Sequence, residues 1–540
     1  MPSGIDHAMN SPQTAIGKGT VGEPTPAPKG KNGLCFKVAL FFDGTMNNRT
    51  NTEVRISQPG ILQVTEGGAG SSYGNYYSNV AIMEYMNLRK KNVRHEVSVY
   101  VEGIGTVNFS EEKKKAGVPD ALNGADNRQG NAFGSGPTGI RDKVTKGIVE
   151  LRYKIGQAYN PKNQFVQKII IDVVGFSRGA AAARHFVSRR DEVQQPLYKQ
   201  SAPALVINFV GLFETVSSFD EGGEDMSGIV GNGLVGKTEG VFDDDVKQLG
   251  LTLGAIPKRV VHLTADDEHR ENFSLTTINS SLAAHVGFEL GLPGVHSDIG
   301  GGYVEAGQGA LNLEVKRIGD PEEKRRLIAE GWYTDGTNGT KNQFVPSGPE
   351  SPSVVPRKIG YGKYSVETPA IPQYHLTKWE SAVRSITTEY QFVPLYLMLG
   401  LATKQGSDGA HEALELESLG MAKNAGYRVP QPLVALRDYF AAYVCANAGR
   451  TTRQHVHCRT IAERNVLRNK YLHRSTNRPT DGGEAYLANA SASNDTRVII
   501  DDTKLVDKLH KRAIDRTKKI PAQVEEVWDG GRKKTGRIVG

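Results

Sequence analysis

The sequence predicts an α/β protein in which helices cover both faces of a mostly parallel β-sheet. Five short runs rich in β-branched and apolar residues occur along the first half of the chain, each ends in turn residues, and helix-like stretches separate them. This alternation is typical of parallel strands joined by crossover helices. We therefore expect strands at residues 36–42, 97–101, 166–174, 205–212 and 259–263.

The length predicts more than one structural part. A chain of 540 residues exceeds the size at which one hydrophobic core usually stops growing. Residues 1–33, which are rich in Gly and Pro, are expected to form a flexible tail, and residues 34–305 a catalytic core. We expect residues 306–540 to form a cap, a lid or an accessory region that can include further core elements.

Two segments of that last region leave alternatives open. Residues 392–403 are almost entirely apolar, so we expect a helix that either packs in the core or contacts an acyl chain or a bilayer. The basic residues 504–540 predict either a basic amphipathic helix or a merely solvated face.

Composition predicts a soluble protein made in the cytoplasm, without metal or cofactor. No apolar run approaches the roughly 18 residues that a membrane-spanning helix needs, and the first thirty residues lack the apolar segment of a signal peptide. Three cysteines without a Cys-x-x-Cys spacing argue against a disulfide framework or a zinc site. The net charge of +7 favours anionic partners, but the lack of an aromatic platform or binding motif argues against nucleic acid.

A candidate nucleophile comes from the pattern Gly-x-Ser-x-Gly, which occurs at residues 70–74 and again at residues 175–179. Such a serine must sit on a sharp turn between a strand and a helix. Ser72 lies in a Gly-rich loop without a preceding strand, whereas Ser177 follows a β-branched run and precedes an Ala-rich helix former. The sequence therefore predicts Ser177 as the nucleophile and an α/β-hydrolase-type sheet around it.

The serine needs a base and an acid, which follow it in the order Ser, Asp or Glu, His in this type of fold. His296 stands in a Gly-rich loop and is the best candidate for the base, while the other candidates, His262 and His285, are expected to be structural. Glu214 ends a predicted strand and is the favoured acid. Asp266 and Asp267, which follow the next strand, are the alternative acids.

Two N–H donors are expected to bind the oxyanion. One is the N–H of Arg178, directly after the nucleophile, and the other belongs to Gly44 or Thr45 in an earlier strand-end loop. Asp43 is expected to fix that loop by accepting a hydrogen bond. For the acidic run at residues 243–245, an exposed helix start is favoured over a cation site.

Five motifs resemble those of the DUF2235 hydrolases and, more narrowly, type VI secretion phospholipase effectors of the Tle1 family. The resemblance spans about residues 36–305 and is weaker at residues 471–475, and its motifs lie at residues 41–45, 175–181, 211–216, 267–270 and 294–303. It implies a phospholipase A with Ser177 as nucleophile and His296 as base. Glu214 departs from the Asp that the family usually has, so a nearby Asp remains an alternative acid.

The resemblance also implies a function and partners. It predicts an antibacterial enzyme that hydrolyses acyl esters of membrane glycerophospholipids after loading onto a VgrG spike and delivery, without a signal peptide, into the periplasm of a rival cell. A cognate immunity protein is expected. From the residues alone, a soluble carboxylesterase and a non-catalytic interaction protein with the same fold remain alternatives.

Overall fold

The protein was analysed as a computed structural model. It describes the following residues: 23–58, 60, 71–87, 95–106, 126, 134–194, 202–219, 245–270, 273–303, 312–318, 321–334, 344–346, 357–359, 366–368, 380–403, 414–417, 426–475, 497–504, 523–529 and 532–539.

A seven-stranded sheet forms the centre of the described structure, in the order β13-β7-β5-β4-β3-β1-β2. Every neighbouring pair in it runs parallel. Its strands are β1 (Asn32–Phe42), β2 (Glu96–Val101), β3 (Gln164–Phe176), β4 (Ala204–Phe213), β5 (Arg259–Ala265), β7 (Gly287–Leu292) and β13 (Gln454–His455). The mostly parallel sheet expected from the sequence is confirmed, and all five expected strands belong to it.

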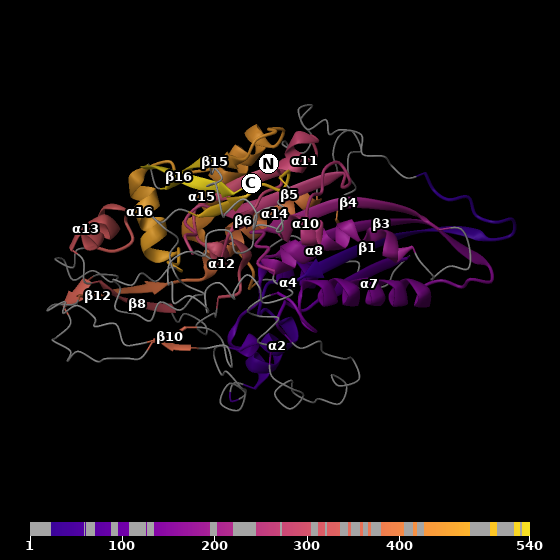
Figure 1. The fold of residues 1–540 in the computed structure, drawn as a ribbon, viewed down its shortest axis with the longest axis horizontal. Helices are drawn as coiled ribbons and strands as arrows, with labels where there is room; N and C mark the ends of the chain where they lie inside the picture. Colours follow the sequence, from indigo (N-terminus) through magenta and orange to yellow (C-terminus); the bar gives the residue numbers. More distant parts are fainter. Residues whose placement is uncertain are drawn as a thin grey trace.

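Helices cover both faces of this sheet, and Figure 1 shows α7 and α8 alongside β1 and β3. One buried cluster joins the sheet to α7 (Ile140–Gln157), α8 (Arg178–Ser188) and α10 (Asp245–Leu249). The other joins it to α4 (Asn79–Met86), α12 (His296–Gly300), α14 (Phe392–Thr403) and α15 (Gln431–Asn447). Fully buried strands of Val, Ile, Leu and Phe are what two covered faces require.

Smaller elements accompany this core. A three-stranded sheet contains β8, β12 and β9, a hairpin contains β10 and β11, and a four-stranded sheet has the order β15-β16-β14-β6. Their bounds are β6 (Leu275–Thr276), β8 (Asn312–Ile318), β9 (Phe344–Pro346), β10 (Arg357–Ile359), β11 (Val366–Thr368), β12 (Glu380–Ile386), β14 (Val498–Ile500), β15 (Gln523–Asp529) and β16 (Arg532–Val539). The remaining α-helices are α2 (Arg49–Ser57), α11 (Asn279–Ala283), α13 (Pro321–Ala329) and α16 (Ile461–Lys470).

The basic end of the chain, for which a basic amphipathic helix was one of the two alternatives, contains two strands instead. β15 and β16 pair antiparallel there, and β16 pairs in parallel with β14. These strands contain the β-branched residues Val524, Val527, Thr535, Ile538 and Val539, a strand signal that the basic composition obscured. Residues 505–522 lie outside the described part of the chain.

Within the same described ranges, no helix combines the length and the apolar character that crossing a membrane requires. The apolar helix α14 has the expected bounds, and it packs against β4 and β5 on one face of the sheet. Leu397 and Met398 on it are fully buried. The observed packing is that of a core helix.

Shortening a buried side chain on α14 should therefore destabilise the fold. Leu397→Ala removes a fully buried side chain, and such substitutions cost about 2–5 kcal/mol through lost burial and the cavity that remains. We expect a lower melting temperature and a lower denaturant midpoint. Val466→Ala, at a side chain that is 51% exposed on α16, is the control and should change stability by less than about 0.5 kcal/mol. Equal stability of the two variants would contradict the core position of α14.

Candidate active site

Ser177 lies on a strained turn between β3 and α8. Its φ of 58° and ψ of −129° fall in a region that non-Gly residues rarely adopt. Glycines make this turn possible. A Cβ at Gly175 would lie 2.4 Å from the Gly179 carbonyl oxygen, and a Cβ at Gly179 would lie 2.2 Å from that of Asp43. The structure thus has the strand, turn and helix that the motif at 175–179 predicted.

The backbone of Ser177 forms hydrogen bonds with residues on either side of Glu214, the candidate acid. Its N–H donates to the Phe213 carbonyl at 3.0 Å, and its own carbonyl accepts from the Val216 N–H at 3.4 Å. Glu214, between them, directly follows β4 and also has a positive φ of 51°. Because β3 and β4 are adjacent parallel strands, Ser177 and Glu214 emerge at the same edge of the sheet.

Glu214 contacts the candidate base. Its Oε2 lies 3.0 Å from Nδ1 of His296, the first residue of α12. An ionised carboxylate only accepts hydrogen bonds, so Nδ1 carries the proton and the lone pair of a neutral ring is on Nε2. That is the tautomer required of a base that takes a hydroxyl proton.

Arg497, just before β14, binds both oxygens of the same carboxylate. Its Nη1 lies 2.9 Å from Oε1 of Glu214, and its Nη2 lies 2.6 Å from Oε2. The Ala265 N–H donates to Oε1 at 2.5 Å. The carboxylate is fully buried, and these contacts supply the hydrogen bonds and the counter-charge that such a position requires.

The surroundings bring both groups to the charge states that this chemistry needs. Burial acts to raise the pKa of Glu214, but the Arg497 charge and the hydrogen bonds from His296 and Arg497 outweigh it and lower that pKa to about 2. Burial lowers the pKa of His296 below its ordinary value, against the opposing effect of Glu214. Near neutral pH the site therefore holds an ionised acid beside a neutral imidazole.

A second buried carboxylate fixes the backbone of His296. Oε2 of Glu268 accepts the His296 N–H at 3.2 Å, and both Glu268 oxygens accept from the Ser475 hydroxyl at 3.1 Å. Arg270 pairs with Glu268 at 2.9 Å. Burial acts to raise the pKa of Glu268, but Arg270 outweighs it and holds that pKa far below the ordinary range. Glu268 is thus an ionised anchor of the loop that carries His296.

Two aromatic rings enclose the imidazole of His296. The ring centroid of Phe176, directly before Ser177, lies 4.8 Å from that of His296, and the ring of Phe273 lies at 4.9 Å on edge. These described residues bring the base beside the turn of Ser177, although no hydrogen bond joins the Ser177 and His296 side chains. In ligand-free sites such bonds are often long and tighten only when substrate binds.

The predicted oxyanion loop follows β1, next to the turn that carries Ser177. Asp43 fixes this loop as expected, because its carboxylate accepts from the Gly44 N–H at 2.8 Å, from the Tyr100 hydroxyl at 2.5 Å and from Ser78. Nε of Arg178 donates to Oγ1 of Thr45 at 2.8 Å. The Gly44 N–H is therefore engaged, whereas the Thr45 N–H makes no hydrogen bond to any described residue. Thr45 is the better placed of the two candidates.

The alternative acids contact other groups. Oδ1 of Asp266 lies 2.9 Å from Nδ1 of His455 on β13. Asp267 accepts from Arg468 at 2.6 Å and from the Gly294 N–H at 2.8 Å. Each joins the end of β5 to the C-terminal half of the chain, whereas the carboxylate beside Nδ1 of His296 is that of Glu214. The geometry therefore favours Glu214 as the acid.

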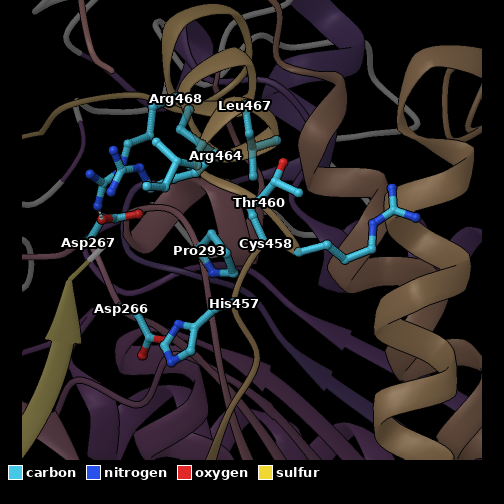
Figure 2. Close-up of a pocket in the computed structure, with 12 residues that line it drawn as sticks. Asp266, Asp267, Pro293, His457, Cys458, Thr460, Arg464, Leu467 and Arg468 are labelled. Atoms are coloured by element: carbon cyan, nitrogen blue, oxygen red, sulfur yellow. Dashed lines mark hydrogen bonds and ion pairs between the residues drawn. The ribbon is translucent and has the colours of Figure 1, made fainter. Parts of the chain in front are cut away.

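A pocket of about 250 Å³ lies beside these two aspartates, and Figure 2 shows Asp266 next to His457 and Asp267 below the two arginine side chains of α16. None of Ser177, Glu214 and His296 lines it. Its walls are Asp266, Asp267, Pro293, His457, Cys458, Arg459, Thr460, Ile461, Arg464, Leu467, Arg468 and Leu472. This cavity is separate from the proposed reaction centre.

The remaining candidates have structural contacts. The Ser72 hydroxyl donates to Asp126 at 3.0 Å, which fits its expected role outside catalysis. Asp245 begins α10 as expected but is buried rather than exposed, because it accepts the Phe219 N–H at 3.1 Å. Residues 243 and 244 lie outside the described part of the chain. Among the residues that the structure does describe, no group of three or more His, Cys, Asp or Glu side chains could hold a metal ion.

Sequence reasoning missed Arg497 and gave Glu268 no separate role. Arg497 lies 283 positions from Glu214 and belongs to no motif, so only the fold brings the two together. Glu268 lies within the motif at 267–270, whose dense charge after a buried strand was the available signal.

The mostly parallel central sheet with helices on both faces defines an α/β-hydrolase-like fold, and Ser177, Glu214 and His296 all follow strands at the same edge of that sheet. Residues 188–319 match the family model described as "T6SS, Phospholipase effector Tle1-like, catalytic domain". This segment includes Glu214 and His296 and begins after Ser177. The resemblance to the Tle1 family that the motifs indicated is thereby confirmed.

The comparison with solved structures supports this fold through one chain, and a second chain is only weakly similar. A chain in "Structure of the Tle1 effector bound to the VgrG spike from the Type 6 secretion system" is 21% identical, with a TM-score of 0.50, over 88% of this chain and 95% of that one. An uncharacterized protein from Pseudomonas aeruginosa is 16% identical, with a TM-score of 0.34, over 80% of this chain and 52% of that one. No curated protein matches the chain.

The close approach at Gly179 predicts a strong effect of a single methyl group. In Gly179→Ala the added Cβ would lie 2.2 Å from a carbonyl oxygen of the oxyanion loop, and backbone cannot move aside cheaply. We expect a loss of about 1–3 kcal/mol of stability, measured as a lower melting temperature. Gly426→Ala, where nothing lies within 4 Å of the added Cβ, is the matched control. A Gly179→Ala variant as stable as this control would refute the close packing of the turn.

Proposed function

We propose that this protein is a serine esterase that hydrolyses acyl ester bonds of membrane glycerophospholipids, a phospholipase A, and acts as a type VI secretion effector. The observation that supports the chemistry is the strained turn at Ser177. Its backbone hydrogen-bonds to the residues on either side of Glu214, and the Glu214 carboxylate contacts Nδ1 of His296. The Tle1-like match of residues 188–319 supports the substrate class.

Each group has one role in the proposed reaction. The Ser177 hydroxyl attacks the acyl carbonyl as its proton moves to Nε2 of His296, and Glu214 stabilises the resulting imidazolium. The N–H groups of Arg178 and Thr45 bind the oxyanion. The bond to the lysolipid oxygen then breaks and His296 returns the proton to that oxygen. Water, deprotonated by His296, releases the fatty acid and restores Ser177.

The route of delivery is proposed on the same resemblance. The structurally similar Tle1 effector is described as bound to the VgrG spike, and we propose a VgrG partner for this chain as well. An effector that cleaves membrane lipid in a rival cell's periplasm would need an immunity protein in the cell that makes it.

Replacing the nucleophile tests the proposed activity. Ser177→Ala should abolish fatty-acid release from phosphatidylethanolamine and phosphatidylglycerol vesicles, because the acyl-enzyme cannot form. Mass spectrometry of the lipid products, with circular dichroism to verify folding, measures this. The control is Ser72→Ala, at the other Gly-x-Ser-x-Gly sequence, which should retain release.

The outcomes separate the candidate functions. Undiminished release by Ser177→Ala would refute the proposed nucleophile. Wild-type cleavage of p-nitrophenyl butyrate without cleavage of vesicles would favour a carboxylesterase for small esters. Failure of Ser177 to react with a fluorophosphonate probe would instead favour a non-catalytic protein.

The low pKa of His296 predicts activity in mild acid. The base must be neutral, so activity is present above its pKa and is lost as the pH falls through that value. Because burial lowers the pKa of His296 below 6.5, the acid limb of kcat/KM should lie below pH 6.5. Rates on a soluble ester between pH 4.5 and 8 measure this limb. A midpoint at or above pH 6.5 would contradict the proposed environment of the base.

A further inference from the structure

The C-terminal segment at residues 497–502 makes two buried ionic contacts with the catalytic core. Arg497 binds Glu214 through two hydrogen bonds, and Asp502 pairs with Arg184 of the nucleophile helix α8 at 3.1 Å. The side chains of the second pair are fully buried, and those of the first almost so. Only the first pair contacts a group of the proposed triad, so the two pairs can be compared within one segment.

Arg497 is held in a fixed orientation. Its Nε donates to the Phe273 carbonyl at 2.8 Å, and its Nη1 also donates to the Ala265 carbonyl at 3.2 Å. Its side chain is only 5% exposed. The planar guanidinium can bind both oxygens of a carboxylate at once, which the point charge of a lysine cannot do.

We propose that Arg497 is a positioning residue of the reaction centre: it holds both oxygens of Glu214 so that Oε2 faces His296, and its charge offsets the carboxylate so that the imidazole stays neutral. The inference rests on the proposed function. It assigns a role to a residue outside every motif of the sequence, in a segment about 200 residues beyond the base.

The charges around His296 determine the direction of the expected effect. Glu214 at the end of β4 and Glu268 after β5 favour the imidazolium, whereas Arg270 disfavours it. The positive charge of Arg497 keeps Glu214 ionised and offsets its negative charge. In Arg497→Met the carboxylate loses this partner, so its full charge acts on His296 and the imidazolium becomes more stable. The acid limb should therefore move to higher pH by about one unit.

The experiment follows the labelling rate of Ser177 by a fluorophosphonate probe between pH 4.5 and 8, because this reaction does not depend on the lipid substrate. Arg497→Met should label at least about tenfold more slowly near neutral pH and show the raised acid limb. Arg497→Lys keeps the charge without the planar fork. It should label more slowly than wild type while its acid limb stays near the wild-type position.

The matched control is Arg184→Met, which breaks the other buried ion pair of the same segment. It should lower the melting temperature as Arg497→Met does, because both leave a buried carboxylate unpaired. Its acid limb should stay where it is in the wild type. A raised limb in both variants would show general loosening of the core and overturn the inference.

Other outcomes are equally decisive. An unmoved acid limb in Arg497→Met, or a wild-type labelling rate in Arg497→Lys, would overturn the positioning role; the second result decides if Arg497→Met does not fold. If the wild type itself does not label, the proposed function fails. The titration of His296 followed by NMR, in wild type and Arg497→Lys or Arg497→Met, then still tests how Arg497 acts on the imidazole.

Discussion

The buried carboxylate of Glu214 is the constraint around which the reaction centre is arranged. A carboxylate without water is unstable unless opposite charge and hydrogen-bond donors surround it. Here the donors are the Ala265 N–H, the Arg497 guanidinium and the His296 imidazole. They come from the end of β5, the residue just before β14 and the first residue of α12. One charge thus brings together three segments that are far apart along the chain.

The parallel sheet makes this convergence possible. Its strands all end at one edge, so the loops that follow β3, β4, β5 and β7 meet there. These loops carry Ser177, Glu214, Glu268 and His296 in that order. Hydrogen bonds between neighbouring loops, such as that from the Glu214 N–H to the Leu263 carbonyl at 2.8 Å, fix their spacing. The chemistry therefore depends on strand order more than on any single loop.

Local patterns were enough to predict the sheet and the strand-turn-helix at Ser177. The strands are runs of β-branched residues, and the glycines beside Ser177 are required by contacts within that turn, so each leaves a signal in a short window of sequence. Arg497 leaves no such signal, because its role arises only when β14 pairs with β6 beside the loop after β5. The exposed helix start expected at Asp245 was wrong, and the amphipathic helix that was one alternative for the basic C-terminal segment is not what residues 523–529 and 532–539 form. Both have a related reason: composition does not reveal which neighbours a segment meets.

The Glu at position 214, where the resembling family usually has Asp, is explained by the same network. Its extra methylene moves the carboxylate farther from the backbone, and the positive φ of 51° at Glu214 shows that the backbone adopts an unusual turn here. The next residue is fixed, since the Thr215 N–H donates to Nε2 of His262 at 3.0 Å and Nδ1 of His262 contacts Glu289 at 2.8 Å.

A fixed backbone and a longer side chain leave the carboxylate free to rotate unless something holds it from the side. The guanidinium of Arg497, which contacts both oxygens, prevents that rotation. Glu214 and Arg497 are therefore best understood as one unit. A shorter Asp at position 214 would draw the carboxylate away from Arg497. The buried guanidinium would then lose its carboxylate partner, so the two residues constrain each other.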